Sequence, residues 1–234
     1  MSAAPRWLAP LVDAPGGDPA QLRRDSSTLP GRIADPRESA VLVLLGGDPD
    51  ADTRPADASV VLTHRSPQLR RHAGQMAFPG GKTDPGDRGP VHTALREAAE
   101  ETGLDPAGVD PLRVLDRIGI RRTGFAVRPV LAYWRTPGPL RAVDPAETDE
   151  VLTVAVDELV DPANRLRVGL AGWSGPAFRV GDYVVWGFTA GVLAHLLDHA
   201  GWSRPWDDGP VQDLRRTLAA SANRESLGLG GRLR

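Results

Sequence analysis

The segment from Arg96 to Leu104, Arg-Glu-Ala-Ala-Glu-Glu-Thr-Gly-Leu, constrains the fold of this chain more than any other stretch. At about 100° per residue, a helix places Glu97, Glu100 and Glu101 within a single arc of about 100°. The opposite side carries small or apolar residues, so the helix can lie close to a sheet. Gly103 is a favourable residue to end it. We therefore predict a helix over residues 91–103 with one apolar side and one side of three carboxylates.

Three carboxylates on one side of a helix need an explanation. Like charges four residues apart destabilise an exposed helix by roughly 0.2–0.5 kcal/mol per pair, and partial burial raises the cost. Mg²⁺ prefers hard oxygen ligands, so a metal site would stabilise such a cluster. A solvated charged face is the alternative. The loop segment Phe78-Pro79-Gly80-Gly81 upstream and Arg96, directly before Glu97, favour the metal site.

The remaining pattern predicts a mixed sheet covered by helices, and hence one domain of the α/β (α+β) class. Apolar and β-branched runs predict strands at residues 40–45, 59–63, 112–120, 125–134, 151–156 and 183–186, with residues 121–124 as a hairpin loop. Helices are predicted at residues 7–12, 157–160, 191–199 and 210–222. We place an N-terminal lead-in with a short helix at residues 1–37, the domain at 38–222 and a flexible tail at 223–234.

Composition excludes several classes of protein. The 234 residues include no cysteine, which rules out disulfide scaffolds, thiolate zinc sites and cysteine nucleophiles. A net charge of −2 gives no support for binding to nucleic acid or to a membrane surface. No apolar run approaches the ~20 residues that span a bilayer, and the first residues do not form a signal peptide pattern. We expect a cytoplasmic protein.

Residues 81–104 resemble the Nudix box, G-x5-E-x7-R-E-U-x-E-E-x-G-U, in which U is a bulky aliphatic residue. The second half matches from Arg96 to Leu104, with the small Ala98 at a U position. In the first half, Asp87 replaces the glutamate, and eight residues instead of seven separate it from Arg96. The resemblance implies a Nudix-type α/β/α sandwich with a mixed sheet and a catalytic loop followed by a helix.

The stretch from Val61 to Gly81 is similar to L-L-T-x-R-S/A-x3-R-x3-G-x3-F-P-G-G, a motif of the coenzyme A pyrophosphatase subgroup. Every spacing holds, and Val61 in place of leucine is the single change. The variation around Asp87 is familiar in the same subgroup. Residues 186–190, Trp-Gly-Phe-Thr-Ala, resemble a W-G-x-T-A segment of this subgroup, where we expect structural packing. A strand followed by a basic surface loop is the alternative interpretation of residues 61–81.

The resemblance implies a Mg²⁺ (or Mn²⁺) cofactor. Glu97 and Glu101 are then the expected direct ligands, Glu100 completes the set directly or through water, and the carbonyl of Gly81 or its neighbour adds another oxygen. Arg96 would hold the glutamates in place. A general base is needed, for which Glu100 and Glu147 are the two candidates. The expected catalytic residues are Arg96, Glu97, Glu100, Glu101 and Glu147.

The implied substrate is a small nucleotide derivative, coenzyme A in the subgroup, and the products are adenosine 3′,5′-bisphosphate and 4′-phosphopantetheine. Its several phosphates need cationic donors, and Arg65, Arg70, Arg71 and His72 lie next to the loop. Arg65 and Arg70 are favoured because the other two fall at unspecified motif positions. The alternatives are a Nudix hydrolase of another diphosphate derivative and a nucleotide sensor without catalysis. A homodimer is left open.

Overall fold

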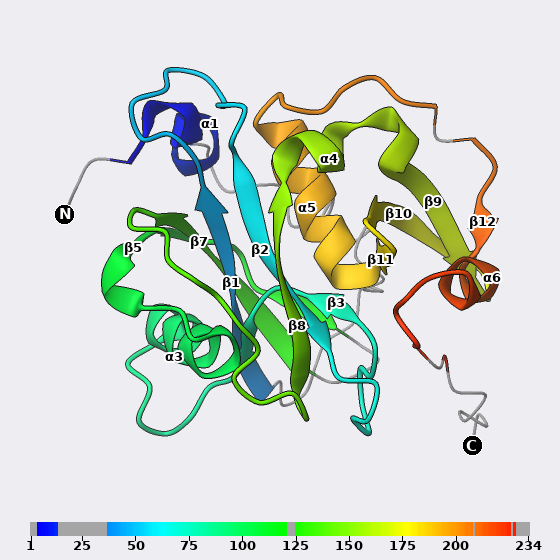
Figure 1. Ribbon diagram of the computed structural model, residues 1–234, viewed down its shortest axis with the longest axis horizontal. Helices are drawn as coiled ribbons and strands as arrows, with labels where there is room; N and C mark the ends of the chain where they lie inside the picture. Colours follow the sequence, from blue (N-terminus) through cyan, green and yellow to red (C-terminus); the bar gives the residue numbers. More distant parts are fainter. Residues whose placement is uncertain (1–3, 14–36, 121–124, 208, 226, 228–234) are drawn as a thin grey trace.

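The computed structural model describes residues 4–13, 37–120, 125–207, 209–225 and 227 (Figure 1). The first sheet contains β1 (Arg37–Gly46), β2 (Ser59–Arg65), β3 (Met76–Ala77), β4 (Gly80–Lys82), β5 (Val109–Val114), β6 (Ile118–Ile120), β7 (Phe125–Trp134) and β8 (Thr148–Ala155). The second contains β9 (Arg165–Leu170), β10 (Trp173–Val180), β11 (Tyr183–Val185) and β12 (Gln212–Asp213). The helices are η1 (Arg6–Leu8), α1 (Ala9–Val12), α3 (Pro90–Thr102), η2 (Pro106–Gly108), α4 (Val156–Val160), η3 (Pro162–Asn164), α5 (Gly187–His199) and α6 (Leu214–Ala219).

The first sheet is mixed, as predicted. Its main order is β3-β2-β1-β7-β5, in which β1 and β7 run parallel and the other neighbours are antiparallel. The strand predicted over residues 112–120 is two strands, because β5 and β6 each pair with β7 in a different register. The hairpin loop predicted at 121–124 lies outside the described residues.

Alternation along β1 divides the core between two helical layers. Ala40, Leu42 and Leu44 share a buried cluster with the small residues of α3, whereas Val43 and Leu45 belong to a cluster with α1 and α5. Successive side chains of a strand point to opposite faces, so β1 must be apolar throughout to sit between two layers. In Figure 1, α3 lies on one side of the sheet and α5 on the other. The predicted α/β/α sandwich is confirmed.

The helix predicted at 91–103 is α3, but its buried side is rotated toward Glu101 from the predicted apolar side, because Glu101 is buried whereas Leu95 and Ala99 are only partly buried. Ala94 and Ala98 have no exposed surface and lie against β1. Gly103 caps the C-terminus in the left-handed conformation, with φ of 70°. The small residues bring the helix axis close to the sheet, which fixes how far the carboxylates stand from the loop at β4.

The second sheet was not predicted. No strand is predicted between the helix at 157–160 and the strand at 183–186, but β9 and β10 form an antiparallel hairpin there, and β11 and β12 complete the sheet. One face packs on α5 through Phe178 and Val185, and the other packs on α6 through Val168 and Leu214. The helix predicted at 210–222 is wrong in length, because residues 212–213 pair with β9 and α6 covers only Leu214–Ala219.

Both ends of the described chain pack on the domain. Trp7 is buried in the main core cluster and its ring lies 5.6 Å from that of Trp202. At the other end, Asn223 is fully buried, so the flexibility predicted from residue 223 onward is wrong for the first residues of the tail. Residues 228–234 of that tail lie outside the described residues. We therefore propose a domain that extends beyond 38–222 at both ends.

Candidate active site

The three glutamates of α3 occupy different environments, although they share one side of the helix. The Glu101 side chain is 8% exposed, that of Glu97 is 19% exposed, and that of Glu100 is 59% exposed. The main-chain N–H of Gly80 donates a hydrogen bond to Glu101 at 3.0 Å. The site is therefore graded from a buried carboxylate at the sheet to an exposed one in solvent.

Arg96 joins helix α3 to the loop before it. It donates to the carboxylates of Glu97 and Glu100, both at 3.1 Å, and to the main-chain carbonyl of Lys82 at 3.0 Å. Its Nε and Nη2 form a bidentate pair with Asp87, at 3.1 and 2.9 Å. The bond to Asp87 is the main reason that the pKa of Arg96 is raised. A planar guanidinium can hold loop and helix together in this way, whereas a lysine cannot.

Asp87, the departure from the family pattern, is the anchor of the loop. Its side chain is 2% exposed and accepts hydrogen bonds from Thr93, His92 and the main-chain N–H of Asp84 besides Arg96. Arg96 and these donors hold the pKa of Asp87 well below its usual range. Asp87 is not among the site residues predicted from the sequence. The sequence signal for its role is that a shorter acid occurs together with one extra residue in the loop.

The glycine pair lets the backbone approach the carboxylates. A Cβ built on Gly81 would lie 2.3 Å from a carboxylate oxygen of Glu97, so any larger residue would displace this side chain. Gly81 is held there by β4, which pairs Gly81 with Ala40 of β1. The predicted proximity of Gly81 to the carboxylates is thus observed, and the sheet register causes it.

Burial disfavours the charged form of these carboxylates. The pKa of Glu101 is raised to about 7, chiefly by burial and also by the charges of Glu97 and Glu147, against the opposing effects of the Gly80 N–H and Arg65. The pKa of Glu97 is also raised, again chiefly by burial. Carboxylates destabilised by desolvation and mutual repulsion gain most from a bound cation.

The residues present fit a divalent cation through their chemistry. Glu97 and Glu101 supply hard carboxylate oxygens. Because Gly81 has no side chain, its main chain lies close to the Glu97 carboxylate. Within the described residues, no group of three acidic, histidine or cysteine side chains is positioned to hold a metal ion. The predicted set of three is therefore not assembled in advance, because Arg96 holds Glu100 at the exposed end.

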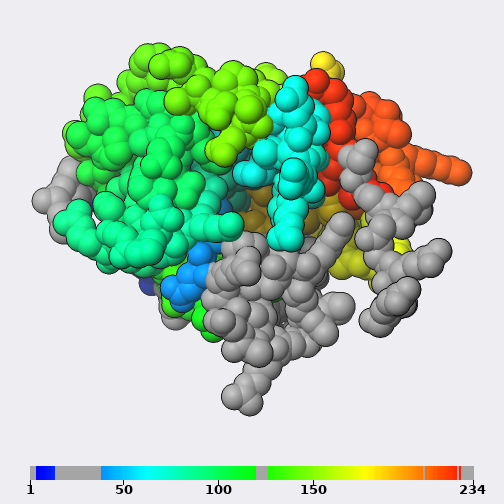
Figure 2. Space-filling view, turned by 90° about the horizontal axis from the view of Figure 1, so that it is seen from below, coloured from blue at the N-terminus to red at the C-terminus, as the bar shows by residue number. Residues whose placement is uncertain are grey.

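The basic loop, which we define as residues 66–75 between β2 and β3, places its cations unevenly. Arg65, at its start, lies 3.6 Å from Glu101, and its Nε is buried without a hydrogen-bond partner among the described residues. Arg70 and Arg71 are exposed. The Nδ1 of His72 pairs with Gln75 at 2.8 Å. Figure 2 shows the cyan loop projecting between the green segments around α3 and the red C-terminal segment.

Glu147 lies at the start of β8, as predicted, and is exposed. Its carbonyl accepts a hydrogen bond from the N–H of Ser66 at 2.8 Å, which joins it to the beginning of the basic loop. Its charge is close enough to raise the pKa of Glu101. The structure thus brings Glu147 to the edge of the carboxylate site.

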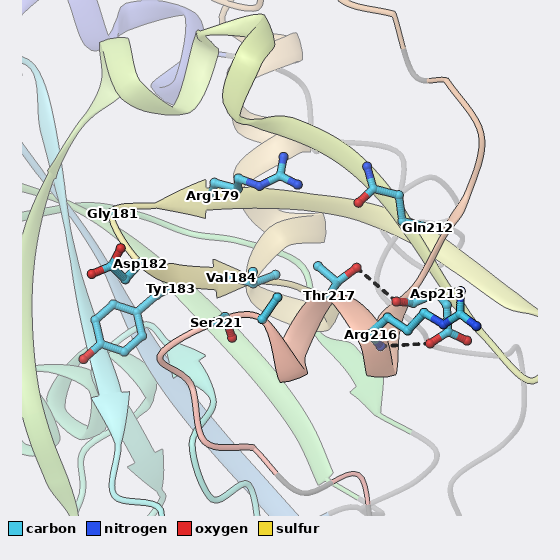
Figure 3. Close-up of a pocket in the computed structure, with 11 residues that line it drawn as sticks. Arg179, Gly181, Asp182, Tyr183, Val184, Gln212, Asp213, Arg216, Thr217 and Ser221 are labelled. Atoms are coloured by element: carbon cyan, nitrogen blue, oxygen red, sulfur yellow. Dashed lines mark hydrogen bonds between the residues drawn. The ribbon is translucent and has the colours of Figure 1, made fainter.

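Two other features lie apart from this site. Thr189, in the segment predicted to serve packing, donates to the carbonyl of Met76 at 3.2 Å and joins α5 to β3. A pocket of about 540 Å³ lies between the β10–β11 hairpin and α6 (Figure 3). It carries Arg179 and Arg216 beside Asp182 and Asp213, and none of the predicted site residues lines it.

Comparison with known proteins gives a consistent family. The NUDIX domain family model matches residues 36–172. "Nudix hydrolase 15, mitochondrial" from Arabidopsis thaliana is 34% identical over 168 residues, which are 68% of this chain and 56% of that protein. "Uncharacterized Nudix hydrolase NudL" from Klebsiella pneumoniae is 35% identical over 179 residues, 72% of this chain and 85% of that protein.

Coverage differs between these relatives. The chain spans about half the length of the plant relatives, 56% and 53%. Among solved structures, a Nudix hydrolase from M. smegmatis, RenU, matches with a TM-score of 0.48 and 20% identity, over 73% of this chain and 89% of that one.

Nudix hydrolases generally use divalent metal ions. Because the family model covers more than half of the chain and NudL is 35% identical over most of its length, this chain belongs to the Nudix domain family.

Proposed function

We propose that this protein is a Mg²⁺-dependent (or Mn²⁺-dependent) hydrolase that cleaves the pyrophosphate of coenzyme A or of its derivatives. Water attacks phosphorus, and the products are adenosine 3′,5′-bisphosphate and 4′-phosphopantetheine. One observation carries the choice of substrate class. The buried Nε of Arg65 has no partner among the described residues and its guanidinium lies 3.6 Å from Glu101. A phosphate oxygen beside the carboxylates would satisfy it.

A divalent ion at this site would neutralise the phosphoryl oxygens and lower the pKa of water. Glu97 and Glu101 would hold the ion, with main-chain oxygen at Gly81 and, through water, Glu100. Arg96 would keep Glu97 in place by its bond at 3.1 Å. Binding would also release protons, because the pKa of Glu101 is raised to about 7 by burial.

The basic loop would bind the remaining phosphates. Coenzyme A carries a 3′-phosphate in addition to its pyrophosphate, so it needs more cations than the metal ion supplies. Arg65 is the cation nearest the carboxylates, and Arg70 is exposed on the same loop. Arg71 and His72 are further candidates. Arginine binds phosphate oxygens in bidentate fashion, which suits a flexible, multiply charged substrate.

Glu147 is the better candidate for the general base. Glu100 already accepts a hydrogen bond from Arg96 at 3.1 Å, so part of its carboxylate is engaged by the guanidinium. Glu147 is exposed at the edge of the site, so a water molecule can reach its carboxylate directly. The reaction would therefore run between Glu147 and the carboxylates of α3.

A substrate panel tests the proposal. Purified protein is incubated with Mg²⁺ and coenzyme A, acyl-coenzyme A, NADH or nucleotide sugars, and products are separated by chromatography. We expect coenzyme A to be cleaved best, and Glu101→Gln to lose most activity while remaining folded. Turnover of another substrate with coenzyme A intact would contradict the substrate class, and binding without turnover would indicate a sensor.

A matched pair of arginine variants tests the basic loop. Arg70→Ala should raise the KM for coenzyme A, whereas Arg179→Ala, an exposed arginine of the second sheet, should leave it unchanged. Equal effects of the two variants would contradict a specific role of the loop.

Location and assembly are separate proposals. Among the described residues, every helix is too short or too polar to cross a membrane. The cytoplasmic location remains a prediction, since two plant relatives are named as mitochondrial and chloroplastic. A homodimer is the state that size-exclusion chromatography with light scattering would test.

A further inference from the structure

The segment from Ser221 to Glu225, which we call the C-terminal strap, is attached to the basic loop. Its central residue, Asn223, is fully buried and acts as a polar link between distant parts of the chain. The side-chain amide donates to the carbonyls of Gly74 and Val184, both at 3.0 Å, and its oxygen accepts from the N–H of Val184 at 2.8 Å. The strap therefore joins the end of the basic loop to β11.

The contact at Gly74 is too close for any other residue. A Cβ built there would lie 2.2 Å from the carbonyl oxygen of Asn223, and the φ of Gly74 is +74°. A glycine in the middle of a phosphate-binding motif would be expected to approach a ligand. Here it approaches the strap instead. The requirement for glycine at this motif position is thus explained by a segment about 150 residues further along the chain.

One ion pair attaches the strap to the first sheet. Arg224 pairs with Asp149 at 2.9 Å, and Asp149 in turn binds the buried His64, whose Nε2 pairs with the Asn223 carbonyl at 3.1 Å. His64 belongs to β2 and Asp149 to β8, so this side of the strap is fixed to the first sheet.

Glu225 links the strap to Gln75, at the C-terminal end of the basic loop. It accepts hydrogen bonds from Gln75 at 2.6 Å and from the indole of Trp186 at 2.8 Å. Gln75 then pairs with His72 at 2.8 Å. A residue of the packing segment, the strap and a predicted phosphate ligand thereby share one network.

The strap binds the base of the basic loop, where the two ends of the loop are hydrogen-bonded to each other. The N–H of Arg65 donates to the carbonyl of Gln75 at 2.9 Å, and the N–H of Gly74 donates to the carbonyl of Arg65 at 3.0 Å. Gly74 and Gln75 are also the loop residues that bind Asn223 and Glu225. The loop bearing Arg70 therefore leaves the sheet at a point that the strap fixes.

We propose that Asn223 and Glu225 are positioning residues for substrate binding, which hold the basic loop beside the carboxylates without touching the substrate. This inference rests on the proposed function, because it assigns the loop to phosphate recognition. Arg96 and the glutamates of α3 make no bond to the strap in the contacts described above. Loosening the strap should therefore weaken binding of the substrate and spare the chemical step.

The main test compares Asn223→Ala with Leu166→Ala, a buried core change in the second sheet away from the loop. Asn223→Ala should raise KM on the order of tenfold, the equivalent of about one lost charge-assisted contact, with kcat within about twofold. Leu166→Ala should leave KM unchanged. A fall in kcat at constant KM, or an equal rise in KM for the control, would overturn the proposal.

A double-mutant cycle shows whether the strap acts through the loop. If it does, Asn223→Ala should have little further effect on KM in an Arg70→Ala background, because the contact that it misplaces is already missing. Fully additive effects would overturn the proposal. Glu225→Ala, which keeps the buried asparagine, provides the same comparison if Asn223→Ala does not fold, and is expected to raise KM by severalfold.

Hydrogen exchange separates this inference from the substrate assignment. Amides of residues 65–75 should exchange faster in Asn223→Ala than in wild type or Leu166→Ala, with or without any substrate. Unchanged exchange would overturn the positioning role even in an active enzyme. If wild type leaves coenzyme A intact, the proposed function fails, and faster exchange would still support attachment of the loop by the strap.

Discussion

Replacing Glu101 by glutamine removes a carboxylate that the metal-free protein ionises at a cost in stability. Burial raises the pKa of Glu101 from 4.5 to about 7. At about 1.4 kcal/mol per pKa unit, this rise corresponds to about 3 kcal/mol between the folded and unfolded states. Since only 8% of the side chain is exposed, little of this cost is screened by solvent.

The sign of the effect follows from proton linkage. The folded protein binds the proton of Glu101 more tightly than the unfolded chain, so this stabilisation is complete below pH ~4.5 and is lost as the pH rises to ~7. Glutamine stays neutral throughout. Without metal, Glu101→Gln should differ from wild type by less than about 1 kcal/mol at pH 5, and should be more stable by about 3 kcal/mol at pH 8.

Urea unfolding in EDTA, followed by fluorescence of the six tryptophans, measures this difference at the two pH values. Glu38→Gln, which changes an exposed glutamate of β1, should show no gain. Adding Mg²⁺ at pH 8 should stabilise wild type more than Glu101→Gln, because the proposed ligand is missing in the variant. A variant no more stable than wild type at pH 8 in EDTA would refute the argument.

Three further predictions concern activity. Asp87→Ala leaves one edge of the Arg96 guanidinium unpaired, so kcat should fall about 10–100-fold in steady-state assays, and unchanged kcat would contradict the anchoring role. Glu147→Gln should lower kcat far more than Glu100→Gln does; the reverse result would make Glu100 the base. EDTA should abolish turnover and either Mg²⁺ or Mn²⁺ should restore it, so activity that survives exhaustive chelation would exclude a metal-dependent step.

The helix that bears the carboxylates was predictable because its information is local. The spacing of Glu97, Glu100 and Glu101 puts the three carboxylates on one side of the helix, and Gly103 ends the helix directly after Thr102. Arg96 and Glu100 are four residues apart, so their side chains come within hydrogen-bonding reach in any such helix.

The second sheet was not predicted because its strands are stabilised by packing against helices that lie elsewhere in the sequence. Pro176 lies within β10 and three glycines lie in the same hairpin, and these residues weaken a strand pattern. Phe178 and Val168 become buried because α5 and α6 cover the two faces of the sheet. Because both covering helices lie outside the hairpin, the pattern of residues 165–180 alone predicts no strand.

By itself, the sequence determined the carboxylate helix, the positions of most strands of the first sheet along the chain and the spacing of the basic motif. All of these depend on residues close together in the chain. Only the tertiary structure decided that Glu101 is buried and Glu100 exposed, because the distance of each from the sheet depends on how α3 packs. The tertiary structure also explains why residue 74 must be glycine. Asn223 contacts Gly74 although the two are about 150 residues apart, and a contact over that separation leaves no periodic pattern in the sequence.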